Sequence, residues 1–319
     1  MNFKGKYITI ILLLFIISKT EAQTCCSGGT PLTGNLGIQG LEAKSWYFQL
    51  GYDYNFLDDL YSGTEKLDDN SRERLTQTIF LQTIYAFSEK FSANVLFSYV
   101  DQKRTIFSSI GETNITSANG LGDVVVLAQY TLFSNLKRSL TIAAGPKLPV
   151  GKFDAVDPVF GLVLSTDLQP GSGSVDGIFG GSFSESHLFD VTGLTLTSSA
   201  GYRLTSAAKR FEGDNNYRFG NEAMVSVGFL KNFLINKTGV TPSLFFRYRQ
   251  TSFDKIEGFE VAGTGGKWIY LNSGLSVEPT NNWSVIVSGE LPVYRNLQGT
   301  QLTTSFRINI GLAIKLYRN

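Results

Sequence analysis

The sequence contains few of the residues that carry most enzymatic and metal chemistry. It has one histidine, two cysteines and two methionines among 319 residues, and only 17% of its residues are charged. A formal net charge of +1 offers nothing to attract the phosphate backbone of a nucleic acid. We therefore expect no nucleic-acid partner, no cofactor, no metal site and no enzymatic activity.

Long apolar runs are also lacking. The longest covers residues 7–17, follows Lys4 and Lys6, and ends before a Thr-Glu-Ala segment at 20–22. It is too short for a membrane-spanning helix, which needs about 20 residues. A basic start, a short apolar run and small residues at a cleavage position are typical of a secretory signal peptide. We predict a signal peptide at residues 1–22, a mature chain that starts at Gln23, and no helical membrane anchor.

Glycine and aromatic residues are abundant instead, with 33 Gly, 24 Phe and 14 Tyr. Near the C-terminus, residues 304–317 alternate without a break: Phe306, Ile308 and Ile310 are apolar, whereas Arg307 and Asn309 between them are polar. Successive side chains of a strand point to opposite faces. If the apolar face meets lipid, a charge there costs about 2 to 4 kcal/mol at the membrane centre. The pattern predicts a strand of an outer-membrane barrel.

The same two-residue period recurs along the chain and predicts twelve strands. Many have about the 9 to 11 residues that a tilted membrane strand needs. The predicted strands cover residues 46–55, 75–86, 92–100, 122–132, 140–148, 175–184, 194–204, 219–229, 240–251, 268–277, 283–293 and 304–317.

The connections between these strands alternate in length. The short ones are 87–91, 134–139, 186–189, 231–239 and 279–282, and the long ones are 57–74, 101–119, 151–174, 205–218 and 252–267, with a shorter last one near 294–301. Short periplasmic turns and long outer loops are typical of outer-membrane barrels. We predict an all-β fold, a transmembrane antiparallel up-and-down β-barrel of about 12 strands, with 10 or 14 as alternatives.

This barrel is expected to occupy residues 45–319, after an N-terminal periplasmic or lumenal segment at 23–44. The expected location is the outer membrane of a Gram-negative bacterium. The expected partners are outer-membrane lipid, the barrel-assembly machinery and a small-molecule solute. Such barrels commonly end in an aromatic residue, whereas here Arg318 and Asn319 follow Tyr317.

Charged residues at the alternate strand positions that face the lumen are candidates for the lining of a pore. They are Arg203, Glu222, Arg247, Arg249 and Arg307, and the predicted topology places them toward the outer ends of their strands. Such a set could select anions or polar solutes at the mouth of a pore. Alternatively, it could be a structural ion-pair cluster that stiffens a filled lumen.

Two segments are candidates for narrowing the lumen: the tail at 23–44 and the long loop at 151–174. The charged residues of the loop that we select are Lys152, Asp154, Asp157 and Asp167.

Cys25 and Cys26 are adjacent, shortly after the predicted cleavage site. The pair could carry a lipid anchor, form a vicinal disulfide, or bind a soft metal or act in redox chemistry. Otherwise it is an unexplained pair in an N-terminal tail or plug segment. A metal site lacks further ligands, because His187 is the single histidine.

His187 is accompanied by Ser184, Glu185 and Ser186. Serine, histidine and an acid are the components of an acyl hydrolase. Neighbours in one turn seldom form a triad, so a lipid-modifying hydrolase is only an alternative function.

Three stretches resemble a known family: residues 120–130 (GLGDVVVLAQY), 145–154 (GPKLPVGKFD) and 167–176 (DLQPGSGSVD). Together they resemble the outer-membrane barrels named after the MetA pathway of phenol degradation and, more loosely, the transporters of fatty acids and aromatic compounds. The resemblance is close over about residues 120–181. It implies an outer-membrane barrel that carries hydrophobic or aromatic small molecules. Pro146 and Pro149 cannot donate to a sheet, so the strand at 140–148 is expected to be bent, bulged or unpaired there.

The function expected from all of this is a monomeric channel for passive uptake or efflux of small molecules. The main alternative is a structural or adhesive barrel with a filled lumen. A soluble periplasmic β-sandwich would not need strands this long or loops of such regularly unequal length.

Overall fold

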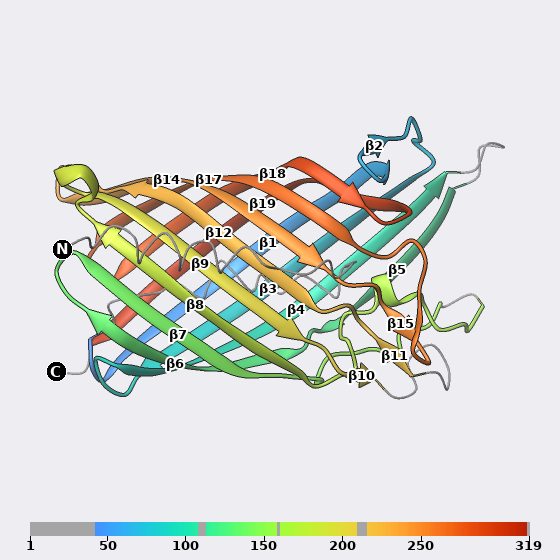
Figure 1. The fold of residues 1–319 in the computed structure, drawn as a ribbon, viewed down its shortest axis with the longest axis horizontal. Helices are drawn as coiled ribbons and strands as arrows, with labels where there is room; N and C mark the ends of the chain where they lie inside the picture. The colour runs from blue at the N-terminus through green and yellow to red at the C-terminus, as the bar shows by residue number, and fades with distance from the viewer. Residues whose placement is uncertain (1–41, 108–112, 158–159, 209–215, 318–319) are drawn as a thin grey trace, which may run out of the picture.

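Twelve antiparallel strands wind around a closed barrel (Figure 1). The computed structural model describes residues 42–107, 113–157, 160–208 and 216–317. The barrel strands are β1 (Ser45–Ser62), β3 (Arg72–Ala86), β4 (Phe91–Phe107), β6 (Val124–Ser134), β7 (Arg138–Leu148), β8 (Asp176–Ser186), β9 (Leu194–Leu204), β12 (Glu222–Lys231), β14 (Thr238–Thr251), β17 (Gly266–Thr280), β18 (Trp283–Leu297) and β19 (Thr300–Tyr317). Each pairs with its two neighbours in the chain, and β1 pairs with β19 to close the ring. The predicted fold and strand number are confirmed.

Several strands run farther than their alternation predicted. β1 and β19 have 18 residues each, and β4 has 17. The extensions replace parts of the predicted long loops: β2 (Glu65–Lys66) pairs with the end of β1, and β5 (Thr113–Leu121) pairs with the end of β4. Near 294–301 the prediction of a loop was wrong, because β18 and β19 continue to a tight turn in which Gly299 has a φ of 77°. These extensions lie beyond the apolar band of the barrel. Their residues are mostly polar, so they do not show the apolar-polar alternation from which the strands were predicted.

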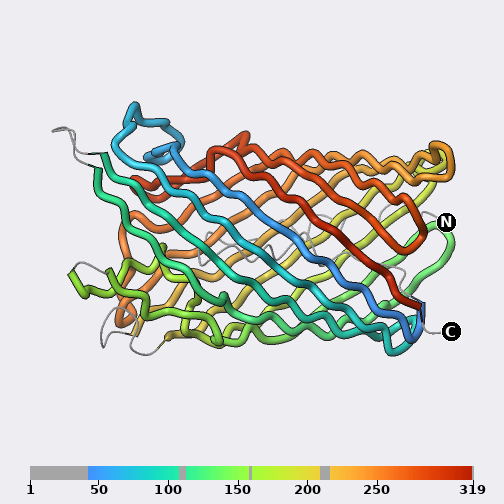
Figure 2. The backbone as a smooth tube through the Cα atoms, turned by 180° about the vertical axis from the view of Figure 1, so that it is seen from behind, coloured from blue at the N-terminus to red at the C-terminus, as the bar shows by residue number. Residues whose placement is uncertain are grey.

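The two ends of the barrel differ, as the loop lengths predicted (Figure 2). At one end, here called the turn end, short turns join the strands, and Ser45 pairs with Tyr317. Two of these turns contain the helical turn η2 (Leu188–Asp190) and the short strand β13 (Phe233–Ile235). The opposite end, the loop end, carries the long connections. They contain the helical turn η1 (Thr166–Leu168) and a separate small sheet of β10 (Ala207–Ala208), β11 (Tyr217–Arg218), β15 (Lys255–Ile256) and β16 (Phe259–Glu260).

The outer surface of the barrel is apolar, with aromatic side chains gathered at the turn end. In β19, Ile308 and Ile310 are 41% and 48% exposed, on the parity predicted to face lipid. The ring of Tyr85 lies 4.5 Å from Trp46 and 4.8 Å from Phe87 between centroids. Aromatic girdles of this kind mark the membrane interface in outer-membrane barrels.

The interior is packed unequally. Strands β3, β4, β6, β7 and β8 contribute a buried apolar cluster that consists of Phe80, Leu96, Val125, Leu127, Ala143 and Ile178. Across the lumen, β9, β12, β14, β17 and β18 present mostly small hydroxyl side chains, which are Thr197, Ser199, Ser226, Thr241, Ser243, Ser276 and Ser288. One wall is therefore filled, and the other leaves space.

Within the described ranges, no helix has the length and apolar character needed to cross a membrane. The predicted signal peptide, the Cys25–Cys26 pair and nearly all of the predicted tail lie outside the described residues.

Candidate functional site

A cavity occupies the half of the lumen nearer the turn end. Its volume is about 430 Å³, within the range typical of small-molecule sites. One side of the cavity is formed by the small hydroxyl side chains of β9, β12, β14, β17 and β18, here called the hydroxyl wall. The cavity is also lined by Tyr47, Gln49, Phe80, Phe245, Asn272 and Asn309. Two ion pairs at mid-barrel, Asp53–Arg307 and Arg247–Glu290, also line it. This cavity is the space in which a solute could be held.

The ion pair between β1 and β19 forms across the closing seam of the barrel. The Arg307 Nε atom donates to both carboxylate oxygens of Asp53, at 2.9 Å and 2.7 Å. Asn309 Nδ2 donates to the same carboxylate at 3.5 Å. Asp53 is only 2% exposed, and these donors compensate the cost of burying its carboxylate.

The second ion pair of the cavity joins β14 and β18 across β17. Arg247 Nη2 donates to Glu290 Oε1, and the guanidinium lies 4.6 Å above the ring of Tyr270, which belongs to the intervening strand. Stacking on an aromatic ring is a cation–π interaction that favours arginine over lysine. We call Asp53, Arg247, Glu290 and Arg307 the collar.

The other three predicted lumen residues, Arg203, Glu222 and Arg249, meet nearer the loop end than the collar does. Glu222 Oε2 accepts from Arg203 Nη2 and Arg249 Nη2, each at 3.2 Å, and Glu222 Oε1 accepts from Arg249 Nε at 3.2 Å. Arg249 stacks on Trp268 at 5.1 Å. The structure thus brings all five predicted lumen residues to the inner wall, two in the collar and three in this buried triad.

Two carboxylates of the collar, Asp53 and Glu290, were missing from the sequence-based set. The signal that could have found them is parity, since each lies on the lumen-facing side of its strand. The other missed residues come from the loop at 151–174 and its surroundings.

Loop 151–174 folds into the lumen at the loop end. Leu168 and Gln169 are fully buried. The Gln169 side-chain amide donates to the carbonyls of Ala155 and Leu164, at 3.0 Å and 2.9 Å, and its backbone carbonyl accepts from Gln102 Nε2 at 3.3 Å. These contacts hold the loop against β4 and narrow the lumen.

Of the four charged loop candidates, Asp167 forms ion pairs with the barrel wall. Asp167 Oδ2 lies 2.8 Å from Arg74 Nη1, and Arg104 lies 3.9 Å from Asp167 Oδ1. Lys152 and Asp154 are exposed, and Asp157 Oδ1 accepts from the Phe160 backbone N–H at the tip of the loop. Of the four, Asp167 is the one placed where the lumen narrows.

A pH change tests the Asp167 contact. Burial acts to raise the pKa of Asp167, but Arg74, Ser165 and Arg104 outweigh it and hold this pKa below its usual value. A lowered carboxyl pKa means that the contact is present above the ordinary pKa and is lost only as the pH falls through the lowered one. We expect protease cleavage of loop 151–174 to be equally slow at pH 7 and pH 5. In Asp167→Asn, cleavage should be faster at both values; an acceleration of wild-type cleavage between pH 7 and pH 5 would contradict this.

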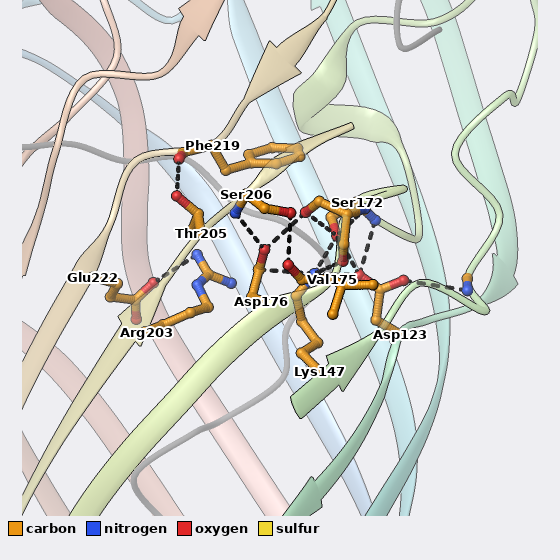
Figure 3. A network of polar contacts seen from close by, with 12 residues as sticks. Asp123, Lys147, Ser172, Val175, Asp176, Arg203, Thr205, Ser206, Phe219 and Glu222 are labelled. Carbon is orange, nitrogen blue, oxygen red and sulfur yellow. Dashed lines mark hydrogen bonds and ion pairs between the residues drawn. The ribbon is translucent and has the colours of Figure 1, made fainter. Parts of the chain in front are cut away.

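The base of the loop is fixed by a buried lysine (Figure 3). Lys147 Nζ lies 2.6 Å from Asp123 Oδ2 and 3.0 Å from Asp176 Oδ2, and it also donates to Ser172 Oγ. The side chains of Lys147, Asp123 and Asp176 are at most 5% exposed. We call these four residues the neck cluster.

The neck cluster joins the three stretches that carry the family resemblance. Asp123 lies in the break between β5 and β6, Lys147 near the end of β7, and Ser172 and Asp176 at the end of the loop and the start of β8. The pairing of β6 with β7 skips the positions opposite Gly145 and Pro146, which agrees with the expected irregularity at Pro146. The sequence shows each of the three stretches but not that they meet in the fold.

The outer loops also pack on one another. Phe153 of loop 151–174 packs against a buried cluster of Ala208, Tyr217 and Phe219. Tyr217 donates to Asp254 Oδ2, which links the loops before β12 and before β17. The three loops form one cap over this side of the loop end.

The hydrolase alternative finds no support in the geometry around His187. Its turn is at the turn end, Glu185 pairs with Arg138 at 2.6 Å, and Ser186 accepts from Thr195 at 3.4 Å. The described residues therefore hold no serine–histidine–acid chain at this turn, and they contain no group of three His, Cys, Asp or Glu residues that could bind a metal ion.

No protein-family model matches the sequence, and a comparison with curated proteins found no match. Solved structures are similar in fold. An outer membrane channel from Pseudomonas putida F1 has a TM-score of 0.70 and 11% identity, covering 89% of this chain and 98% of that one. The β domain of the Bordetella autotransporter BrkA has a TM-score of 0.49, 9% identity and coverage of 86% and 100%, and the NanC porin has 0.45, 11% and 85% and 100%. The chain therefore has the fold of a bacterial outer-membrane β-barrel, the fold that the Pseudomonas channel also adopts.

Proposed function

We propose that the protein is an outer-membrane channel through which small molecules, hydrophobic or aromatic ones included, pass without energy input. The observation that carries this proposal is the cavity in the turn-end half of the lumen, which combines a wall of small hydroxyls with aromatic side chains such as Phe80 and Phe245. Pockets that combine apolar and aromatic side chains with well-placed polar groups favour small organic molecules.

We also propose that the protein belongs to the outer-membrane barrels named after the MetA pathway of phenol degradation. The stretches that resemble the barrels named after the MetA pathway of phenol degradation build the neck cluster, which gives their unusual composition a structural reason. We further propose that the tail at 23–44 helps to narrow the lumen. The apolar outer surface is proposed to face lipid, and Tyr317, exposed at the turn end, to contact the assembly machinery.

The test begins with localisation and then measures transport. The protein should fractionate with outer membranes, migrate differently on gels before and after heating, and produce discrete conductance steps in planar bilayers. A folded, heat-modifiable protein that stays silent in bilayers and adds nothing to the permeability of liposomes would contradict the channel proposal.

That negative outcome would favour the structural alternative. Its supporting observation is the filled loop end, where Leu168 and Gln169 are fully buried and the outer loops form a cap. A barrel filled throughout would need no cavity, and the space beside the hydroxyl wall is the reason for preferring a channel.

A further inference from the structure

The charges that line the cavity are balanced. The cavity is lined by four charged residues, two arginines and two carboxylates, and all four belong to the collar. Each arginine contacts one carboxylate: Arg307 pairs with Asp53 at 2.7 Å, and Arg247 pairs with Glu290. Among the described residues of the lining, neither sign of charge is in excess.

The balance continues toward the loop end. The triad of Arg203, Glu222 and Arg249 has one positive charge in excess. The neck cluster, with Lys147 between two aspartates, has one negative charge in excess. Arg203 and Asp176 lie near each other in the same polar network (Figure 3). Three cations therefore face three carboxylates, so the triad and the neck cluster together carry no net charge.

The rest of the lining is uncharged and of two kinds. Small hydroxyl and amide groups such as Ser243, Ser288 and Asn272 can donate or accept hydrogen bonds. Phe80, Phe245 and Ile286 supply apolar contacts. A molecule with an apolar body and a few neutral polar groups can satisfy both kinds of contact.

An ion would fare differently in this space. It must give up water, and hydrogen bonds alone offset only part of that cost unless opposite charge is also available. In the collar each charge is already engaged by its partner, so an anion near Arg247 also meets Glu290, and a cation near Asp53 also meets Arg307. The paired collar thus offers no compensation to either sign.

We propose that the collar sets the specificity of the channel for uncharged, amphipathic small molecules, and that its two ion pairs disfavour solutes of either charge. This inference rests on the proposed channel function and names its solute class. It also makes Arg247 and Glu290 specificity-determining residues whose separate removal has opposite effects.

The solute test uses three phenyl compounds that share one frame. Mandelamide is uncharged, mandelate is an anion, and phenylethanolamine is a cation at pH 7. Their uptake is followed by swelling of liposomes that contain the full-length protein, after subtraction of the rate in protein-free liposomes. We expect mandelamide to enter about tenfold faster than either ion, and an equal or faster rate for an ion would overturn the proposal.

The variants Glu290→Gln and Arg247→Gln test the collar directly. Glu290→Gln leaves Arg247 without its carboxylate, so mandelate uptake should rise and the reversal potential in a KCl gradient should shift toward anion selectivity. Arg247→Gln should produce the opposite shift and faster phenylethanolamine uptake. The double variant restores balance and should return the reversal potential close to that of the wild type.

Glu185→Gln is the matched control. It also breaks an ion pair, with Arg138, but Glu185 follows the lumen-facing Ser184 in β8 and so points away from the lumen. Heat modifiability on gels shows which variants fold. Shifts of the two single variants in the same direction, or no shift in folded variants, would overturn the collar proposal. If the wild type conducts and transports but does not discriminate, this inference fails alone; if it neither conducts nor transports, the channel proposal fails with it.

Discussion

Replacement of residues 153–169 by a short glycine-serine linker is expected to raise the single-channel conductance severalfold. The deletion removes Leu168 and Gln169, which are fully buried, and Asp167, which contacts Arg74 on β3. Conductance follows the narrowest part of a pore, and these residues fill the lumen at the loop end. The barrel should survive, because Lys152 and Gly171 are already joined by a backbone hydrogen bond of 2.7 Å, so a short linker can close the gap.

A matched control shortens the loop between β1 and β3 at residues 64–70, which pairs with the end of β1 rather than filling the lumen. Planar-bilayer recordings compare the two deletions with the wild type. Unchanged conductance in a folded 153–169 variant would show that the narrowest point lies elsewhere in the lumen.

The variant Lys147→Met is expected to lower the free energy of unfolding by about 3 to 5 kcal/mol, the usual cost of leaving buried charges without their partner. Methionine keeps much of the side-chain volume but leaves Asp123 and Asp176 facing each other at a site where both are at most 5% exposed. Two carboxylates in such a place repel each other, and loop 151–174 should detach. Urea unfolding in lipid or detergent measures the loss, and protease cleavage reports on the loop.

Lys152→Met is the control for that experiment. Lys152 lies in the same loop but is exposed, and its backbone makes the contacts that fix it. Its stability should change by less than about 0.5 kcal/mol. If Lys147→Met cost no more than this control, the neck cluster would not be what holds the loop.

The membrane-spanning part of the fold was predictable because lipid imposes a strict alternation. β19 showed it most clearly: Ile308 and Ile310 are exposed on the outside, and Arg307 lies on the lumen side between them. Once the parity was known, the arginines of the lumen followed. The strand ends beyond the membrane obey no such rule, which is why the turn between β18 and β19 was mistaken for a loop.

The partners in the candidate site were harder to predict, because they depend on how the barrel closes. Asp53 and Arg307 are 254 positions apart and meet only since β1 pairs with β19. Arg247 and Glu290 belong to strands that are second neighbours, with Tyr270 between them. Two-residue periodicity assigns a face to each side chain, but the height at which two strands meet depends on register and strand tilt.

The loop inside the lumen gave still weaker signals. Asp167 was selected for its charge, yet Leu168 and Gln169 beside it are fully buried. A leucine and a glutamine in a long loop look like ordinary surface residues in the sequence. Their burial depends on the neck cluster, whose parts come from three separate stretches of the chain.

Gly151 and Gly171 cross at the base of the loop so closely that a Cβ atom on either would lie within 2.8 Å of the backbone of the other. The two ends of the segment between them therefore leave the barrel at almost one point. Since closing a longer loop adds little entropic cost, that segment is suited to serve as an exchangeable cassette. Inserts of other lengths and chemistries could be grafted between the two glycines with the strands and their pairing unchanged, which would let the bore of this barrel be engineered separately from its wall.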